Sequence, residues 1–162
     1  MSGLGQGSTA EVDAMKLKFE KSLEDYNYWW REIDELWHEM ARKTGLSDSA
    51  FEILYCILEL GEGCLQKDLC DINSMSKQTV HSAVKKLERD GLIESGNENG
   101  RDKRVYLTPM GKAFTREKIL PFAEMENAVF AEMSDEESRE LIRLTRKYQE
   151  EFRKKLREKN IL

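Results

Sequence analysis

Residues 76–108 carry the pattern that most constrains the fold, an amphipathic helix that leads directly into a hairpin. Ser76 can cap this helix, and Gly91 closes it. Two short strand-like runs then lie on either side of Asn99-Gly100, which is one of the strongest short signals for a hairpin turn. A capped helix joined in this way to two strands predicts a mainly α chain with a small β-hairpin wing.

A short helix and a turn precede this unit and complete a helix-turn-helix. The apolar spacing predicts the short helix over 65–71, the turn over 72–75, and hairpin strands over 92–94 and 104–108. A further helix begins at Ser47 or Asp48, either of which can cap it.

Amphipathic helices are predicted at both ends of the chain. Apolar residues recur at steps of three and four from Val12 to Met40, and this helix ends at Gly45. The last helix opens with a capping box at Ser134, and Pro121 interrupts the helical segment before it. The apolar faces of these helices require a partner, and a second copy of the chain is the simplest one.

The charge distribution is uneven although the net charge is −5. Residues 76–108 contain 7 lysines and arginines against 5 carboxylates, whereas residues 11–60 contain 6 against 12. A local basic excess in an acidic chain is compatible with a surface that faces phosphates. The odd count of 3 cysteines fits reduced thiols. With no apolar run of membrane length and no secretory signal, we expect a cytoplasmic protein that does not contact membranes.

The outward face of the capped helix has the chemistry that a DNA groove requires. With Val80 inward, a step of 100° per residue also turns Ala83, Val84 and Leu87 inward. The opposite face is polar or cationic, has no carboxylate, and consists of Gln78, Ser82, Lys85 and Arg89, with His81 on its flank. Amide, hydroxyl and cationic groups can read base edges, while Lys77 and Thr79 near the helix start suit phosphates.

The chain resembles the multiple-antibiotic-resistance regulator (MarR) family of winged-helix transcription factors. The resemblance is most specific over residues 65–113, through the segments QKDL, SKQTV, KKLERDGLIE and RVYLTPMGK. It implies a homodimer held by the N- and C-terminal helices, with the capped helix in the major groove of double-stranded DNA and the wing in the minor groove. It also implies a pseudo-palindromic operator, and repression that a small aromatic effector releases.

The resemblance places Arg101 in the minor groove. The family usually has aspartate two positions earlier, where this chain has Asn99, and Cys70 stands where a small alanine is usual. The complete set of DNA-binding residues predicted is Ser76, Lys77, Gln78, Thr79, His81, Ser82, Lys85, Lys86, Arg101, Lys103 and Arg104.

A crevice between the dimerisation helices and the winged helix is the effector site that the resemblance implies. Trp29, His38 and Tyr55 are the candidate effector residues. The alternative is that aromatic residues at helical spacing form the dimer core, which suits Trp30 and Trp37.

Other functions have weaker support in the sequence. A thiol-based redox regulator is one alternative, with Cys64 as its best candidate, and a winged-helix adaptor for protein–protein contacts is another. With no histidine and cysteine cluster at ligand spacing, no phosphate loop and no catalytic motif, we expect no metal, no cofactor and no enzyme activity.

The chain is therefore predicted to have four parts. They are a flexible tail over 1–10, an N-terminal dimerisation helix over 11–45, the winged-helix DNA-binding domain over 46–108, and C-terminal dimerisation helices over 109–162. Within the DNA-binding domain, the recognition helix is predicted over 76–90 and the wing over 92–108.

Overall fold

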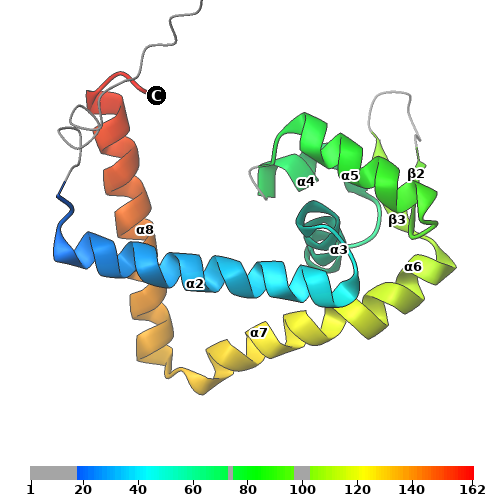
Figure 1. Cartoon of the computed structure of the whole chain (residues 1–162), viewed down its shortest axis with the longest axis horizontal. Coiled ribbons are helices and arrows are strands. Elements are labelled where there is room, and N and C mark those ends of the chain that lie inside the picture. The colour runs from blue at the N-terminus through cyan, green and yellow to red at the C-terminus, as the bar shows by residue number, and fades with distance from the viewer. Residues whose placement is uncertain (1–17, 73–74, 97–102) are drawn as a thin grey trace, which may run out of the picture.

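A computed structural model of the chain describes residues 18–72, 75–96 and 103–162 (Figure 1). The first helix in this part of the chain is α2, Lys21–Thr44, which ends at Gly45 with a left-handed φ of 78°. The predicted end is therefore confirmed, because glycine adopts this conformation without a steric penalty.

The start of that helix differs from the prediction of one helix running on from Val12. Residues 18–20 are not helical, so Phe19 lies before α2, while residues 12–17 lie outside the described part. Glu20 has an extended backbone with ψ of 142° and precedes the first helical turn. Apolar periodicity continues across this break, which explains why the pattern alone placed the start too early.

The helix-turn-helix consists of α3 (Asp48–Leu60), α4 (Gln66–Ile72) and α5 (Lys77–Arg89). The Oγ of Ser76 accepts a hydrogen bond from the backbone N–H of Thr79 at 3.0 Å, so the predicted cap of α5 is confirmed. Helix α5 packs against both α3 and α4.

The sheet has three antiparallel strands where the sequence predicted two. Strands β1 (Cys64–Leu65), β2 (Ile93–Gly96) and β3 (Arg104–Leu107) lie in the order β1-β3-β2. In this register Val105 pairs with Cys64 on one side and with Ser95 on the other. The predicted hairpin strands are confirmed, but a two-residue strand such as β1 has no periodic pattern by which the sequence could predict it.

One core joins the helix-turn-helix, the sheet and the helical segment that follows. Leu54 of α3, Leu69 of α4, Leu87 of α5, Val105 of β3 and Ile119 are all fully buried. Burial of such side chains stabilises the fold by about 1.5–3 kcal/mol each. This core holds α5 against the base of the wing.

The helical segment after the sheet contains the irregularity that Pro121 predicted. Helix α6 (Pro109–Phe114) is followed by one π-helical turn, Thr115–Ile119, and then by α7, Leu120–Glu132. The Leu120 N–H bonds to the Thr115 carbonyl, an i to i−5 contact. Because proline has no N–H, the usual hydrogen bond to the carbonyl four residues earlier is absent, and the turn widens just before it.

The last helix, α8 (Asp135–Glu158), begins with the predicted capping box at Ser134 and Glu137. It crosses the N-terminal half of α2, while the winged helix lies at the other end of α2 (Figure 1). The rings of Tyr26 and Tyr148 meet at this crossing, with centroids 4.7 Å apart. Among the described residues, none of the helices is long and apolar enough to cross a bilayer.

Candidate nucleic-acid interface

Helix α5 presents the polar face that the sequence predicted. Val80, Ala83, Val84 and Leu87 are buried in the core. The exposed residues on the other side of the helix are Gln78, His81, Ser82, Lys85 and Arg89. The inward and outward assignments are therefore both confirmed, because the helix has a single apolar stripe that fixes its rotation.

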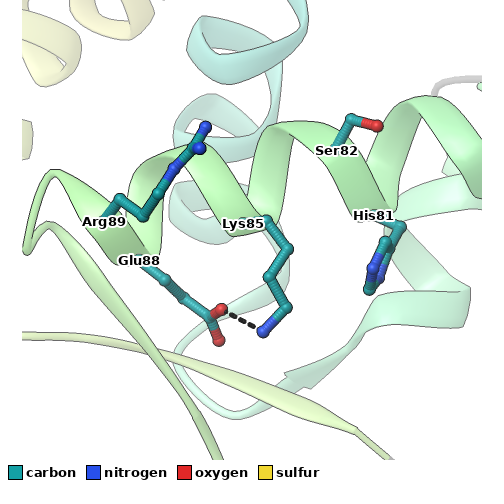
Figure 2. A pocket seen from close by; sticks show the side chains of 5 residues that line it. All are labelled: His81, Ser82, Lys85, Glu88 and Arg89. Atoms are coloured by element: carbon teal, nitrogen blue, oxygen red, sulfur yellow. Dashed lines mark hydrogen bonds and ion pairs between the residues drawn. The ribbon is translucent and has the colours of Figure 1, made fainter.

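A shallow surface hollow lies along this exposed face (Figure 2). His81, Ser82, Lys85, Glu88 and Arg89 line it. Figure 2 shows the Lys85 side chain extended toward the Glu88 carboxylate, and the Lys85 Nζ lies 2.6 Å from the Glu88 Oε2.

The prediction of a face without carboxylates is therefore wrong. Glu88 is three residues after Lys85, so the two side chains are neighbours on the helix surface, and an i, i+3 search of the sequence could have found the pair. The carboxylate also accepts a hydrogen bond from the Ser95 Oγ of β2. The bond from Lys85 is the main reason that the pKa of Glu88 lies below its ordinary value, and the Ser95 bond and the charge of Lys103 add to it.

The first turn of α5 combines a cap with exposed polar side chains. Ser76 and Thr79 are hydrogen-bonded to each other through their hydroxyl oxygens, 2.8 Å apart. Lys77 and Gln78 between them are exposed. The first turn of a helix carries N–H groups without helical acceptors and a partial positive charge, so this end of α5 suits phosphate oxygens.

Lys86 and Arg104, two of the cations predicted to bind DNA, have partners within the protein. Lys86 is half-buried, and its Nζ lies 3.8 Å from the Asp90 Oδ2. Arg104 is also half-buried, and its Nη1 donates to the Gly63 carbonyl at 2.6 Å. Arg104 thus links β3 to the turn before β1 through a hydrogen bond. Its contact with DNA stays a prediction.

The tip of the wing falls outside the described residues, and with it Arg101 and the Asn99-Gly100 turn. Lys103 is exposed at the edge of that gap, directly before β3. Strands β2 and β3 leave the body of the protein beside the C-terminal half of α5 (Figure 1), where Ser95 contacts Glu88. The recognition helix and the wing base therefore form one continuous surface.

The three predicted effector residues do not meet in one pocket of the described structure. Trp29 is 64% exposed and makes an edge contact with Tyr28. His38 lies between Asp48, 3.0 Å from its Nδ1, and Asp34, 3.4 Å from its Nε2. The hydrogen bond to Asp48 is the main cause of a raised pKa at His38.

Tyr55, the third effector candidate, packs on Trp37 with ring centroids 5.2 Å apart. Its hydroxyl donates to the Glu126 carboxylate of α7, and burial together with this bond raises the pKa of Tyr55. Trp37 therefore packs against the core of the protomer, and its place in a dimer core stays a prediction.

An apolar groove of about 470 Å³ lies instead between α2 and α7. Its principal lining residues are Ile33, Trp37, Met40, Phe122, Met125 and Val129. The sequence could not predict this groove, because it depends on how two helices about ninety positions apart in the chain are packed together.

Cys64, the best candidate for the redox alternative, lacks the exposed environment that a reactive thiol requires. Cys64 is buried in β1, and burial raises the pKa of its thiol, which disfavours the reactive thiolate. Cys56 is buried and Cys70 is half-buried. Within the described residues, no group of three or more histidine, cysteine or carboxylate side chains is arranged to hold a metal ion.

Comparison with known proteins places the helix-turn-helix in a family. Residues 44–105 match the model of the MarR family. No curated protein sequence matches the chain.

Solved structures match over most of the chain. NMB1585, a MarR family regulator from Neisseria meningitidis, is 26% identical with a TM-score of 0.72, covering 86% of this chain and 99% of that one. A putative MarR family transcriptional regulator from Listeria monocytogenes, complexed with 26-mer DNA, is 26% identical with a TM-score of 0.64, covering 83% and 89%. S. aureus MepR in its DNA complex has a TM-score of 0.64 at 20% identity, covering 83% and 99%, a likeness of fold.

Proposed function

The chain belongs to the MarR family of DNA-binding, winged-helix transcription regulators, and on this premise we propose that it acts as a homodimeric repressor of a pseudo-palindromic operator. The observation that carries the proposal is the exposed face of α5, where amide, hydroxyl and cationic groups stand opposite a fully buried apolar stripe. This face has the donors and acceptors that base edges require, and the base of the wing extends it.

In the proposed complex, α5 enters the major groove with Gln78, Ser82 and Lys85 toward the base edges. His81 lies at the side of the groove, and Ser76, Lys77 and Thr79 approach the phosphates through the first turn of the helix. Lys86, Lys103 and Arg104 lie toward the flanking backbone, and Arg101 enters the minor groove. Narrow minor grooves have an enhanced negative potential that attracts arginine.

Two copies of α5, related by the two-fold axis of a dimer, would read two half-sites about one helical turn apart. Such a dimer bound across a promoter represses transcription by occluding it. Release by an aromatic effector at Trp29, His38 and Tyr55 stays a prediction from the sequence, because these side chains do not share a pocket in the described structure.

DNA binding is tested with a duplex enriched by the protein from a random-sequence library, labelled and titrated by fluorescence anisotropy. Affinity should fall by about 10³–10⁵ between about 50 and 200 mM salt if six to ten phosphates are contacted. A shuffled duplex of equal length is the control and should bind more weakly by about 10³ or more. Absence of binding to either duplex at low salt would contradict the proposed function.

The proposed dimer rests on apolar side chains that the protomer leaves in solvent on α2 and α8. On α2 they include Tyr26, Trp29, Trp30, Ile33 and Leu36, and on α8 they are Leu141, Ile142, Leu144, Tyr148 and Phe152, each at least 40% exposed. Exposed apolar surface of this extent marks an interaction site. The exposed apolar residues of α2 and α8 lie on two helices that cross each other (Figure 1), so a second copy of the chain can cover both sets together.

Leu144→Glu is expected to weaken the dimer at least tenfold, because a carboxylate would be buried in the apolar interface. The wild-type mass by light scattering should be twice the 18.9 kDa of one chain. Arg146→Gln is the matched control, since it changes the net charge equally but lies on the opposite face of α8. A monomeric wild-type protein at micromolar concentration would refute the homodimer.

A further inference from the structure

A chain of polar contacts connects the recognition helix with the wing and with α4. Glu88 accepts from the Lys85 Nζ through one carboxylate oxygen and from the Ser95 Oγ through the other. The Ser95 Oγ in turn lies 3.4 Å from the Gln66 Nε2 and accepts its hydrogen bond. Three elements, α5, β2 and α4, are therefore joined through the hydroxyl of Ser95.

Glu88 is half-buried, whereas the other side chains along this face of α5 are exposed. Its side chain is 20% exposed, whereas that of its partner Lys85 is 55% exposed. Ser95 lies opposite Val105, a fully buried residue of the core, so its own position is fixed by the sheet. The carboxylate is thus a half-buried, doubly hydrogen-bonded negative group beside a surface that, in the proposed function, approaches phosphates.

We propose that Glu88 is a positioning residue that determines the specificity of this regulator for its operator over other DNA. The inference rests on the proposed function. Glu88 acts in two ways. Its negative charge pairs with Lys85, and its carboxylate accepts a hydrogen bond from Ser95 at the base of the wing.

The charge acts on binding to any sequence. Lys85 paired with Glu88 is neutralised within the protein, and the pair must separate before the ammonium can neutralise a phosphate. Sequence-independent affinity comes almost entirely from such phosphate contacts. Glu88 therefore lowers non-specific affinity.

The hydrogen bond acts on binding to the operator. Ser95 is next to Gly96, which forms with Arg104 the last described pair of β2 and β3. A fixed distance between α5 and this point sets the distance between groove-reading side chains and the wing. Such preorganisation favours the one duplex geometry that satisfies both elements.

Two substitutions separate these effects. Glu88→Gln removes the charge but keeps an oxygen that can accept from Ser95. Ser95→Ala removes the link to the wing but keeps the pair of Glu88 with Lys85. Glu94→Gln is the control for Glu88→Gln. Glu94 is an exposed carboxylate on β2, the strand that contains Ser95, and its replacement changes the net charge by the same amount as Glu88→Gln.

The probes are the library-enriched duplex and the shuffled duplex of the same length, and circular dichroism establishes that each variant is folded. For Glu88→Gln we expect about 3- to 10-fold tighter binding to the shuffled duplex. The slope of log affinity against log salt should steepen by about 0.9, since Lys85 gains a phosphate. For Ser95→Ala we expect about fivefold weaker binding to the enriched duplex and no change on the shuffled one.

Equal effects of Glu88→Gln and Glu94→Gln on affinity and salt slope would overturn the inference, because net charge alone would then explain them. Unchanged operator affinity in Ser95→Ala would overturn it as well. Both outcomes leave the proposed function intact, whereas a wild-type protein that binds neither duplex contradicts the proposed function itself.

Discussion

Gln78→Glu is expected to weaken binding to the enriched duplex by at least about 30-fold, without any loss of thermal stability. Gln78 is exposed in the first turn of α5, two residues after the Ser76 cap. Glutamine can donate to and accept from adenine, whereas a carboxylate only accepts and is repelled by the phosphates on both sides of the groove. Loss of one such bidentate contact costs about 1–3 kcal/mol, and the repulsion adds to it.

The same carboxylate favours the fold. A negative charge near a helix N-terminus stabilises the helix by about 0.3–1 kcal/mol, so the melting temperature should stay level or rise slightly. DNA binding and stability should therefore change in opposite directions, which a general folding defect cannot produce.

Asn127→Asp is the matched control for this prediction. It converts an amide to a carboxylate at an exposed position of α7, away from α5, and should change affinity by no more than about twofold. If Gln78→Glu and Asn127→Asp bind the enriched duplex equally well, α5 does not present Gln78 to DNA.

Gly111→Ala is expected to destabilise the protein by about 3 kcal/mol or more. A Cβ at Gly111 would lie 1.7 Å from the backbone oxygen of Leu92, far inside contact distance. Leu92 cannot easily retreat, because its carbonyl accepts from the Thr108 N–H at 3.1 Å and its own N–H bonds to Leu87 at 2.9 Å. Leu92 lies in the connection between α5 and β2, so the clash should lower the affinity for the operator as well as the stability of the fold.

Thermal unfolding by circular dichroism measures this effect. A loss of 3 kcal/mol corresponds to a fall of about 6–12 °C in melting temperature for a chain of this length. Lys112→Ala at the next position removes only an exposed ion pair with Glu62 and should cost less than about 1 kcal/mol. An unchanged melting temperature in Gly111→Ala would show that α6 can move away from the Leu92 backbone.

The helix caps and the buried stripe of the recognition helix could be predicted from the sequence alone. Ser76 and Ser134 cap α5 and α8, and Gly45 ends α2, as their local patterns indicate. These features depend on hydrogen bonds and rotations within a few residues, so the local sequence contains them. The resemblance of residues 65–113 to a family then indicated the function of the unit, and residues 44–105 match the model of that family.

The candidate site was predicted less completely. Its exposed face on α5 was correct, but Glu88 was assigned no place on it, because rotation about the helix axis ignores how far a glutamate side chain reaches. The Nζ of Lys85 lies 2.6 Å from the Oε2 of Glu88, although the two residues point in different directions from the helix axis. The effector residues were chosen for their chemistry, and they stay a prediction.

What the sequence by itself determined is which residues form helices, where most of them begin and end, and which face of α5 is polar. Only the tertiary structure decided which distant residues meet. Arg104 bonds to Gly63, 41 positions away, and Tyr55 bonds to Glu126, 71 positions away. Strand β1, the contact of Glu88 with Ser95, and the groove between α2 and α7 have the same origin. Local hydrogen bonds are set within one turn of the chain, whereas these contacts exist only once the whole core has packed.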